Sequence, residues 1–288
     1  MGWLRWASIG LLIVSLEINA SLRVALIDQF YPPMVHTPQT HLYGLLDLDD
    51  DRTPEPYFHG DLVQMVAAHP QLLFLRYPLE VGQPGIPQIL MRLQQIQVRF
   101  KEFPIDALLL SWESSTLISA FERPLNPDNT KHYKALLREW GLRDPVWQQS
   151  WQIIRYLEWL TARDVKVFTI AGNGGTGMVN TFSFAQGVIT VGALEPELRH
   201  FVANNPLVDR QEKAAYQLVR VDSQKGDVLG YDLTGDNCLD IPLDKFSSGG
   251  VNAQDYPKRH WKVLKGSSFS APAALKAVLV GEHSNQCK

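Results

Sequence analysis

A serine-rich segment near the end of the chain has the residue types for nucleophilic chemistry. Residues 264–279, LKGSSFSAPAALKAVL, place Ser267, Ser268 and Ser270 directly before an apolar, alanine-rich run. A serine hydroxyl becomes a nucleophile when a neighbouring base takes its proton. A helix start would favour an oxyanion there, because its backbone N–H groups are free. The alternative interpretation is that the serines cap the helix, and this segment alone favours capping.

Two further residues have the chemistry to activate such a serine. His59 directly precedes an apolar helix predicted over 60–68, with Gly60 expected to leave open space beside the ring. Asp28 ends an apolar strand predicted over 23–28, where a carboxylate needs a partner, and holding a histidine in one tautomer is such a task. The alternatives are that Asp28 caps a turn and that His59, one of eight histidines, has no special role.

A glycine-rich segment, TIAGNGGTG at 169–177, follows a predicted strand. Its glycines match the G-x-G-x-x-G spacing of dinucleotide sites: Gly172, Gly174 and Gly177. Such a site needs a helix immediately after the glycines. Here the next residues are polar and aromatic, and a strand begins near Val188, which leaves no room for that helix. The alternative is that the Asn173 amide donates a hydrogen bond to an oxyanion, with the glycines admitting a substrate.

Apolar segments of strand and helix type alternate along the chain. Strands are predicted at 23–28, 71–77, 106–112, 165–172 and 188–194. Helices are predicted at 60–68, 87–100, 146–164 and 269–280, with Pro272 in the first turn of the last. This order predicts an α/β fold with a mostly parallel sheet covered by helices on both faces. Because sites form where such strands end, Asp28, Ser111 and Asn173 are expected at one edge of the sheet.

The length and composition are those of a globular protein with one large domain or two small ones. The chain has 288 residues, 45% of them hydrophobic and 20% charged, and a net charge of -3. That charge balance gives no electrostatic footprint for nucleic acid. We interpret 46–56 and 201–217 as surface excursions, and we see no domain boundary. A monomer is expected.

The first residues have the pattern of a secretory signal peptide over 1–20, with cleavage after Ala20. The alternatives are an N-terminal membrane anchor and an ordinary buried segment. We therefore expect an exported protein, periplasmic or secreted, whose single domain spans 21–288 and does not contact a membrane once the signal is removed.

The cysteines and acidic residues leave two questions open. In an exported protein Cys238 and Cys287 could form a disulfide, and two unpaired thiols are the alternative. The acidic run DLDDD at 47–51 could bind structural calcium, but a solvated loop is the favoured interpretation because no full ligand pattern is visible. No cofactor is expected to be required, and no metal ligand is assigned.

Four segments in this order resemble the subtilisin-like serine peptidases, the subtilases of peptidase family S8. They are VALID with Asp28, HGDLVQMVA with His59, IAGNGG followed by VITVGAL with Asn173, and GSSFSAP with Ser268. Each is common by chance, and their order makes the resemblance specific. It implies a three-layer α/β fold and hydrolysis of a polypeptide through an acyl-enzyme. Asp28, His59 and Ser268 would form the triad, and Asn173 would hold the oxyanion. FSSGG at 246–250 fits the turn ahead of the serine segment.

The resemblance also implies a set of substrate-binding residues: Ser111, Trp112, Glu113, Ala171 and Gly172. The segment 106–115 would be an edge strand to which a peptide adds. Trp112 and Glu113 depart from the small residues usual in the family, and would narrow the specificity pocket or attract a basic residue.

Further departures are Ser267 and Asp61, each where threonine is more usual. The Trp112–Glu113 pair supports a second hypothesis, a catalytically weak or inactive peptide-binding protein on the same scaffold.

Overall fold

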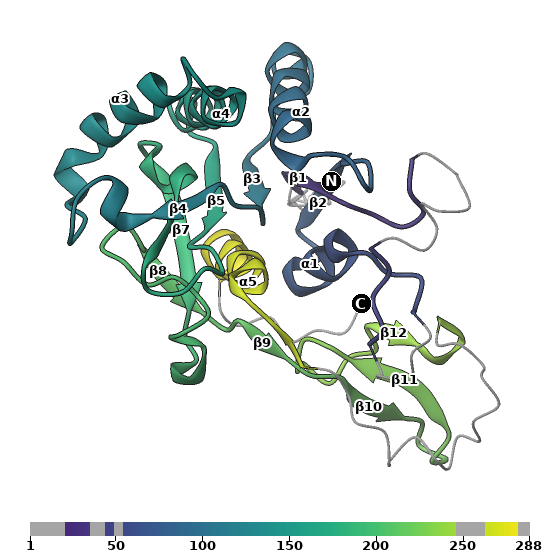
Figure 1. Cartoon of the computed structure of the whole chain (residues 1–288). Helices are drawn as coiled ribbons and strands as arrows, with labels where there is room; N and C mark the ends of the chain where they lie inside the picture. Colours follow the sequence, from purple (N-terminus) through teal and green to yellow (C-terminus); the bar gives the residue numbers. More distant parts are fainter. Residues whose placement is uncertain (1–20, 35–43, 49–53, 246–262, 282–288) are drawn as a thin grey trace, which may run out of the picture.

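A parallel sheet forms the centre of the computed structural model, which describes residues 21–34, 44–48, 54–245 and 263–281 (Figure 1). Its six strands are ordered β2-β1-β3-β5-β7-β8, and every neighbouring pair is parallel. The strands are β1 (Leu22–Asp28), β2 (Leu72–Pro78), β3 (Ala107–Leu110), β5 (Lys166–Ile170), β7 (Val188–Ala193) and β8 (Arg210–Glu212). The α/β fold predicted from the alternating segments is confirmed.

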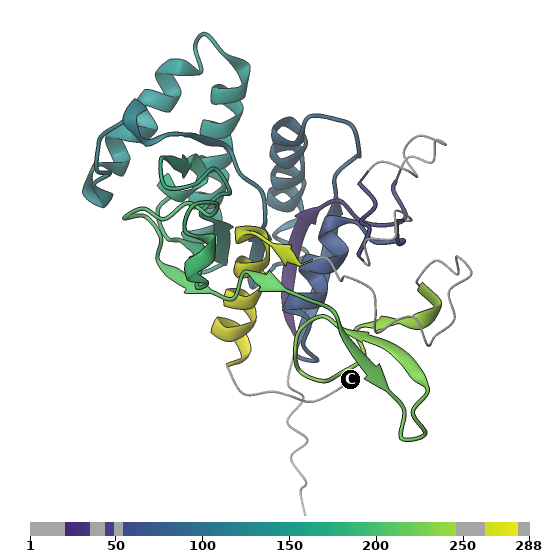
Figure 2. The ribbon, with the colours of Figure 1, turned by 60° about the horizontal axis from the view of Figure 1, so that its bottom comes forward.

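Helices cover both faces of this sheet (Figures 1 and 2). On one face lie α1 (His59–Ala67) and α5 (Ser267–Val280), which contact each other and strands β1, β5 and β7. On the other lie α2 (Gly85–Arg99) and α4 (Pro145–Thr161), and α3 (Thr130–Trp140) packs against α4. The fold therefore has three layers.

Alternation along the strands divides the core between the two faces. In β1, Val24 and Leu26 join the cluster beneath α1 and α5, whereas Ala25 and Ile27 join the cluster beneath α2 and α4. Successive strand residues point to opposite faces, so a strand buried on both faces is apolar throughout. This pattern is the reason that β1 could be recognised from its sequence.

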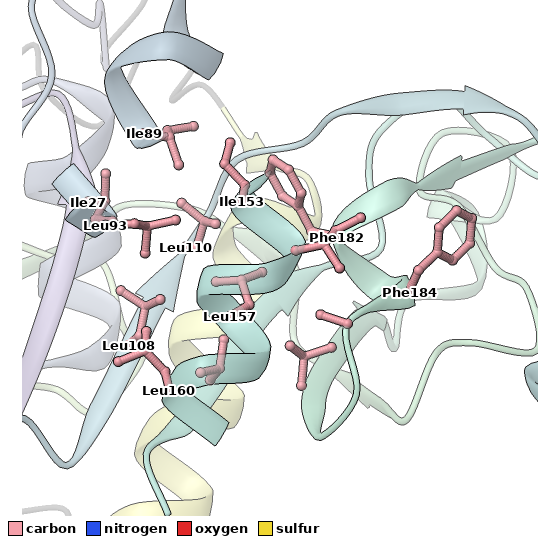
Figure 3. Close-up of a cluster of buried hydrophobic side chains, with 14 of the residues drawn as sticks. Ile27, Ile89, Leu93, Leu108, Leu110, Ile153, Leu157, Leu160, Phe182 and Phe184 are labelled. Carbon is pink, nitrogen blue, oxygen red and sulfur yellow. The ribbon is translucent and has the colours of Figure 1, made fainter. Parts of the chain in front are cut away.

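The cluster beneath α2 and α4, which Figure 3 shows, also contains buried residues of these two helices. Buried residues recur at three- and four-residue steps, as a helix with one apolar face requires. They are Ile89 and Leu93 of α2 and Ile153, Leu157 and Leu160 of α4, packed against Leu108 and Leu110 of β3.

Several short elements complete the described chain. β4 (Ser115–Leu117) pairs with β6 (Met178–Asn180), and β9 (Ala215–Tyr216) pairs with β13 (Leu264–Lys265). A small antiparallel sheet contains β10 (Val219–Asp222), β11 (Val228–Asp232) and β12 (Ile241–Pro242). Short 3-10 helices are η1 (Ile118–Ala120), η2 (Pro127–Asn129), η3 (Thr181–Phe184), η4 (Pro196–Leu198) and η5 (Leu243–Lys245).

The structure corrects two predictions. The segment 106–115 is not an edge strand, because β3 lies between β1 and β5 inside the sheet. The segment 201–217 is not only a surface excursion, because β8 within it extends the central sheet. β8 has three polar residues, so no apolar alternation revealed it.

Other predictions lie partly or wholly outside the described residues: the signal peptide at 1–20, the turn at 246–250, Cys287 and residues 49–51 of the acidic run. Cys238 is disulfide-bonded. Among the described residues, no helix is both long and apolar enough to cross a membrane.

Candidate active site

The structure pairs Asp28 with His59 at the carboxyl end of β1. Asp28 is fully buried, and the His59 Nδ1 lies 3.0 Å from its Oδ1 and 2.8 Å from its Oδ2. A carboxylate only accepts hydrogen bonds, so Nδ1–H is the donor, and in the neutral ring Nε2 carries no proton. The Asp28 Oδ1 also accepts the Gln29 N–H at 2.7 Å. The pairing therefore places the basic nitrogen of the ring away from Asp28.

Gly60 and Asp61 bring His59 to this position. A Cβ on Gly60 would lie 2.6 Å from the Gln29 carbonyl oxygen, so only glycine allows α1 to start this close to β1. The expected open space beside the ring is therefore filled by the end of β1. The Asp61 Oδ2 accepts the N–H groups of Tyr31 and Phe58, both at 2.9 Å, and links the chain after β1 to the start of α1. Here the carboxylate at position 61 has a structural function.

The charge of Asp28 changes the acidity of His59. Burial lowers the pKa of His59, whereas the negative charge of Asp28 and its hydrogen bond raise it, and the pKa lies above the ordinary 6.5. The imidazolium is thus stabilised by the carboxylate beside it. A histidine with this arrangement is suited to take a proton and hold it during a reaction.

Ser268 is the second residue of α5, the helix that packs against α1. The ring of Phe269, the following residue, has its centroid 5.8 Å from that of His59. Ser268 is 9% exposed. Among the described residues, no hydrogen bond is recorded for the Ser268 Oγ or the Ser268 N–H, and none links Ser268 to His59. The hydroxyl and the first-turn N–H are therefore both available to a ligand.

The serines do not cap α5. The N-cap is Gly266, with φ 144°, and no side chain caps the helix start. The Ser270 hydroxyl donates to the Ser267 carbonyl at 2.8 Å, and the Ser267 hydroxyl to the Asn173 Oδ1 at 3.0 Å. The capping interpretation is therefore wrong for Ser268, whose hydroxyl has no local role.

Pro272 leaves the Ser268 carbonyl free to accept a hydrogen bond from outside α5. It was expected in the first turn but is the sixth residue of α5, where its missing N–H leaves the carbonyl four residues earlier without a helical partner. That carbonyl belongs to Ser268, and the Ser111 Oγ donates to it at 3.1 Å. Ser111 therefore anchors the residue after β3 to the backbone of Ser268.

Asn173 is oriented by the residue before Ser268. Its Oδ1 accepts the backbone N–H of Ser267 at 2.9 Å as well as the Ser267 hydroxyl. With the oxygen held there, the donor Nδ2 faces the other way, and no hydrogen bond is recorded for it within the described residues. Asn173 Nδ2 and the Ser268 N–H are thus two donors without a recorded partner among the described residues. The role of Asn173 in holding an oxyanion stays a prediction.

Glu113 lies against the glycine segment that carries Asn173. Its Oε2 accepts the Asn173 N–H at 2.9 Å and the Ser115 hydroxyl at 2.8 Å. A Cβ on Gly172, where φ is 102°, would lie 2.3 Å from that same oxygen. The carboxylate therefore occupies the space above Gly172 and is held at a fixed position.

The Trp112 ring lies against the start of α2, whereas the Glu113 carboxylate lies against Gly172. A Cβ on Gly85, at the start of α2, would lie 2.7 Å from the Trp112 ring. Ala171 is 1% exposed. Substrate binding by Ser111, Trp112, Glu113, Ala171 and Gly172 stays a prediction.

Asn180 has a role that the sequence did not reveal. Its side chain is fully buried, accepts the Ser114 N–H at 3.1 Å and donates to the Ile170 carbonyl at 2.8 Å. It therefore joins the chain beyond β3 to the end of β5. Glu113 and Asn173, which lie on these two segments, are positioned by this one amide.

The glycine segment is not followed by an α-helix. β6 and the short 3-10 helix η3 come next, so the crossover helix of a dinucleotide site is missing here, as predicted. Among the described residues, three aspartates form a cluster whose carboxylate oxygens lie within 4.8 Å of one another: Asp232, Asp236 and Asp240. Backbone N–H groups of the same loop hydrogen-bond to these carboxylates, so the loop's own backbone explains their positions.

No protein-family model matches the sequence, and no curated protein matches it. Solved structures that it is similar to include a lanthipeptide protease, with 15% identity, a TM-score of 0.47 and coverage of 90% of this chain and 72% of that one. Another is the MycP3 protease of the type VII (ESX-3) secretion system, with 14% identity, a TM-score of 0.45 and coverage of 90% and 70%.

A cold adapted subtilisin-like serine proteinase is also among them, with 10% identity, a TM-score of 0.43 and coverage of 90% and 74%. The structures that this chain resembles thus include a subtilisin-like protease.

Proposed function

We propose that the protein is a serine endopeptidase that hydrolyses polypeptides through an acyl-enzyme. The observation that carries this proposal is the pairing of His59 with buried Asp28 at the start of α1, a helix in contact with α5. In α5 the Ser268 hydroxyl neither caps the helix nor has another partner among the described residues.

The proposed steps follow from the positions of these groups. His59 Nε2 takes the proton of Ser268 Oγ, which attacks the peptide carbonyl carbon. Asp28 stabilises the resulting imidazolium, and the oxyanion accepts hydrogen bonds from Asn173 Nδ2 and the Ser268 N–H. His59 then gives its proton to the leaving amine, and water hydrolyses the acyl-enzyme by the same route in reverse. The proposed substrate is a polypeptide, and no metal takes part in any of these steps.

One observation favours a second candidate, a peptide-binding protein with weak or no catalysis. No hydrogen bond joins His59 to Ser268 among the described residues. Catalytic hydrogen bonds are often long without substrate and tighten in the Michaelis complex, so this observation alone does not exclude catalysis. The two candidates differ in whether the peptide is cleaved.

The test is cleavage of a quenched fluorescent peptide library by the full chain and its single variants. We expect Ser268→Ala and His59→Ala to abolish cleavage, and Asn173→Ala to slow it by about 10²–10³-fold. A double variant of Ser268 and His59 should be no worse than either single one, because the two act as a unit. Binding of the same peptides without cleavage would support the second candidate.

Export is a separate part of the proposal. It rests on the apolar N-terminal pattern at 1–20. N-terminal sequencing of the protein from a secreting host should give Ser21 as the first residue, and an intact Met1 on the purified protein would contradict it.

A further inference from the structure

The outer face of α4 carries an aromatic stripe far from the candidate site in the fold. Its residues recur every four positions, so they lie on one helix face, and we name them the α4 stripe: Trp147, Trp151, Arg155 and Trp159. The three tryptophans are partly exposed and Arg155 is exposed. α4 covers the sheet face opposite α5, so the stripe does not belong to the Ser268 site (Figure 1).

Guanidinium groups stack on this stripe. The Cζ atoms of Arg138 and Arg155 lie 5.6 and 5.2 Å from the centroid of the Trp151 ring. The Arg163 Cζ lies 3.9 Å from that of Trp159. Among the described residues, no ion pair is recorded for Arg138 or Arg155. A stacked guanidinium keeps its N–H edge free, and that edge matches a carboxylate in two parallel hydrogen bonds.

Two grooves flank Trp151 and Arg155, which line both. The first lies between α2 and α4, has a volume of about 380 Å³ and includes Gln94, Gln97 and Gln152. The second lies between α3 and α4 and has a volume of about 550 Å³.

The second groove combines apolar surface with positive charge. Leu142, which lines it, is 83% exposed. Lys134 in its wall is paired with Glu158. The other charged residues that line this groove are three cations, Lys131, Arg138 and Arg155, and one carboxylate, Glu139. The charge that remains after pairing is therefore positive.

These properties indicate the occupant. Tryptophan, tyrosine and arginine are enriched where binding energy concentrates in protein interfaces. The glutamine amides of the first groove can hydrogen-bond to a peptide backbone, and the cations of the second need anionic partners. Grooves are concave, so side chains of a polypeptide can enter them, whereas a flat bilayer surface cannot.

We propose that the α4 stripe and its two grooves bind an acidic, partly apolar polypeptide segment. Carboxylates of that segment pair with Arg138 and Arg155, and its apolar side chains pack on Trp151 and Leu142. The proposal does not depend on catalysis by Ser268, because this surface and the candidate site lie in different layers of the fold.

The test is fluorescence anisotropy with the full chain and a fluorescein-labelled amphipathic peptide of Glu, Leu and Ala. We expect saturable binding that strengthens at low salt, and no binding of the same peptide with Lys in place of Glu. The double variant R138E/R155E should weaken binding at least about tenfold. The matched control Lys225→Glu, which changes an exposed cation between β10 and β11, should bind as the unchanged chain does.

Three outcomes would overturn the proposal. They are no saturable binding of the Glu peptide, binding that R138E/R155E leaves unchanged, and tighter binding to anionic phosphatidylglycerol vesicles than to the peptide with the same dependence on Arg138 and Arg155. Arg138 and Arg155 are both exposed, so R138E/R155E should unfold at the same temperature as the unchanged chain. A thermal unfolding measurement therefore separates loss of binding from loss of folding.

Discussion

Replacing Gly60 with alanine puts a methyl group between α1 and β1. The new Cβ would lie 2.6 Å from the Gln29 carbonyl oxygen, 2.7 Å from the Asp28 Cβ and 2.8 Å from the Phe30 ring. Ordinary contact begins near 3.4 Å. The first two neighbours belong to the backbone or lie next to it, so they cannot turn aside, and α1 must move outward by about 0.7 Å.

This movement acts directly on the hydrogen bond between His59 and Asp28. The His59 Nδ1–Asp28 Oδ2 distance of 2.8 Å would approach about 3.5 Å, which is beyond a good hydrogen bond. A displacement near 1 Å costs about 10²-fold in rate, so we expect Gly60→Ala to slow reaction of Ser268 by about 10–100-fold. Overpacking should also lower the free energy of unfolding by about 1–3 kcal/mol.

The assay compares the rate of Ser268 modification and urea unfolding for Gly60→Ala and Gly177→Ala. Gly177 is a matched control, because a Cβ there meets nothing within 4 Å. We expect the control to keep both properties. A Gly60→Ala protein with unchanged reactivity and stability would refute the view that glycine is needed to bring His59 to Asp28.

The rate of Ser268 modification should rise with pH through a pKa above 6.5, because His59 must be neutral to act as a base and Asp28 raises its pKa. The same raised pKa means that protonated His59 stabilises the fold below pH 6.5, and that this stabilisation is lost as the pH rises through the folded-state pKa; urea unfolding across pH measures it. Asp28→Asn should move the rate profile to lower pH and slow the reaction by about 10⁴-fold, and an unmoved profile would contradict the pairing. Asp61→Ala leaves two backbone N–H groups at the start of α1 without their acceptor, so unfolding free energy should fall by about 1–3 kcal/mol, while Asp61→Asn recovers part of it. If Glu113 faces the substrate, peptides with Lys or Arg before the scissile bond should be cleaved best, and Glu113→Gln should reduce that preference at least about tenfold; indifference to a basic residue would reject this role.

Much of the site could be predicted because its residues lie at the ends of regular elements. Asp28 ends an apolar strand, His59 starts a helix, and Ser268 follows a glycine at the start of another. Each position is visible in the local hydrophobic pattern. Parallel strands then bring such ends to one edge of the sheet.

The contacts that orient these residues could not be predicted locally. Gly60 packs against β1, and Ser111 donates to a carbonyl that Pro272 leaves free 157 residues away in sequence. Asn180 joins two segments whose proximity exists only after the sheet has formed. These contacts depend on tertiary approach, for which a sequence pattern has no signal.

The sequence did not predict α3, β8 or the strands of the small sheet, and the reason differs between the helix and the strands. α3 does show a helical signal, since its buried Tyr133 and Leu137 are four residues apart, but its polar remainder conceals it. β8 and the strands of the small sheet have between two and five residues, too few for alternation to stand out.

The most direct measurement of the central claim is labelling of the full chain with a fluorophosphonate probe, followed by mass spectrometry of the modified peptide. The account predicts a label on Ser268 that is lost in Ser268→Ala and strongly reduced in His59→Ala. A folded chain that takes no label, or takes it at another residue, would contradict the proposal that Ser268 is an activated nucleophile.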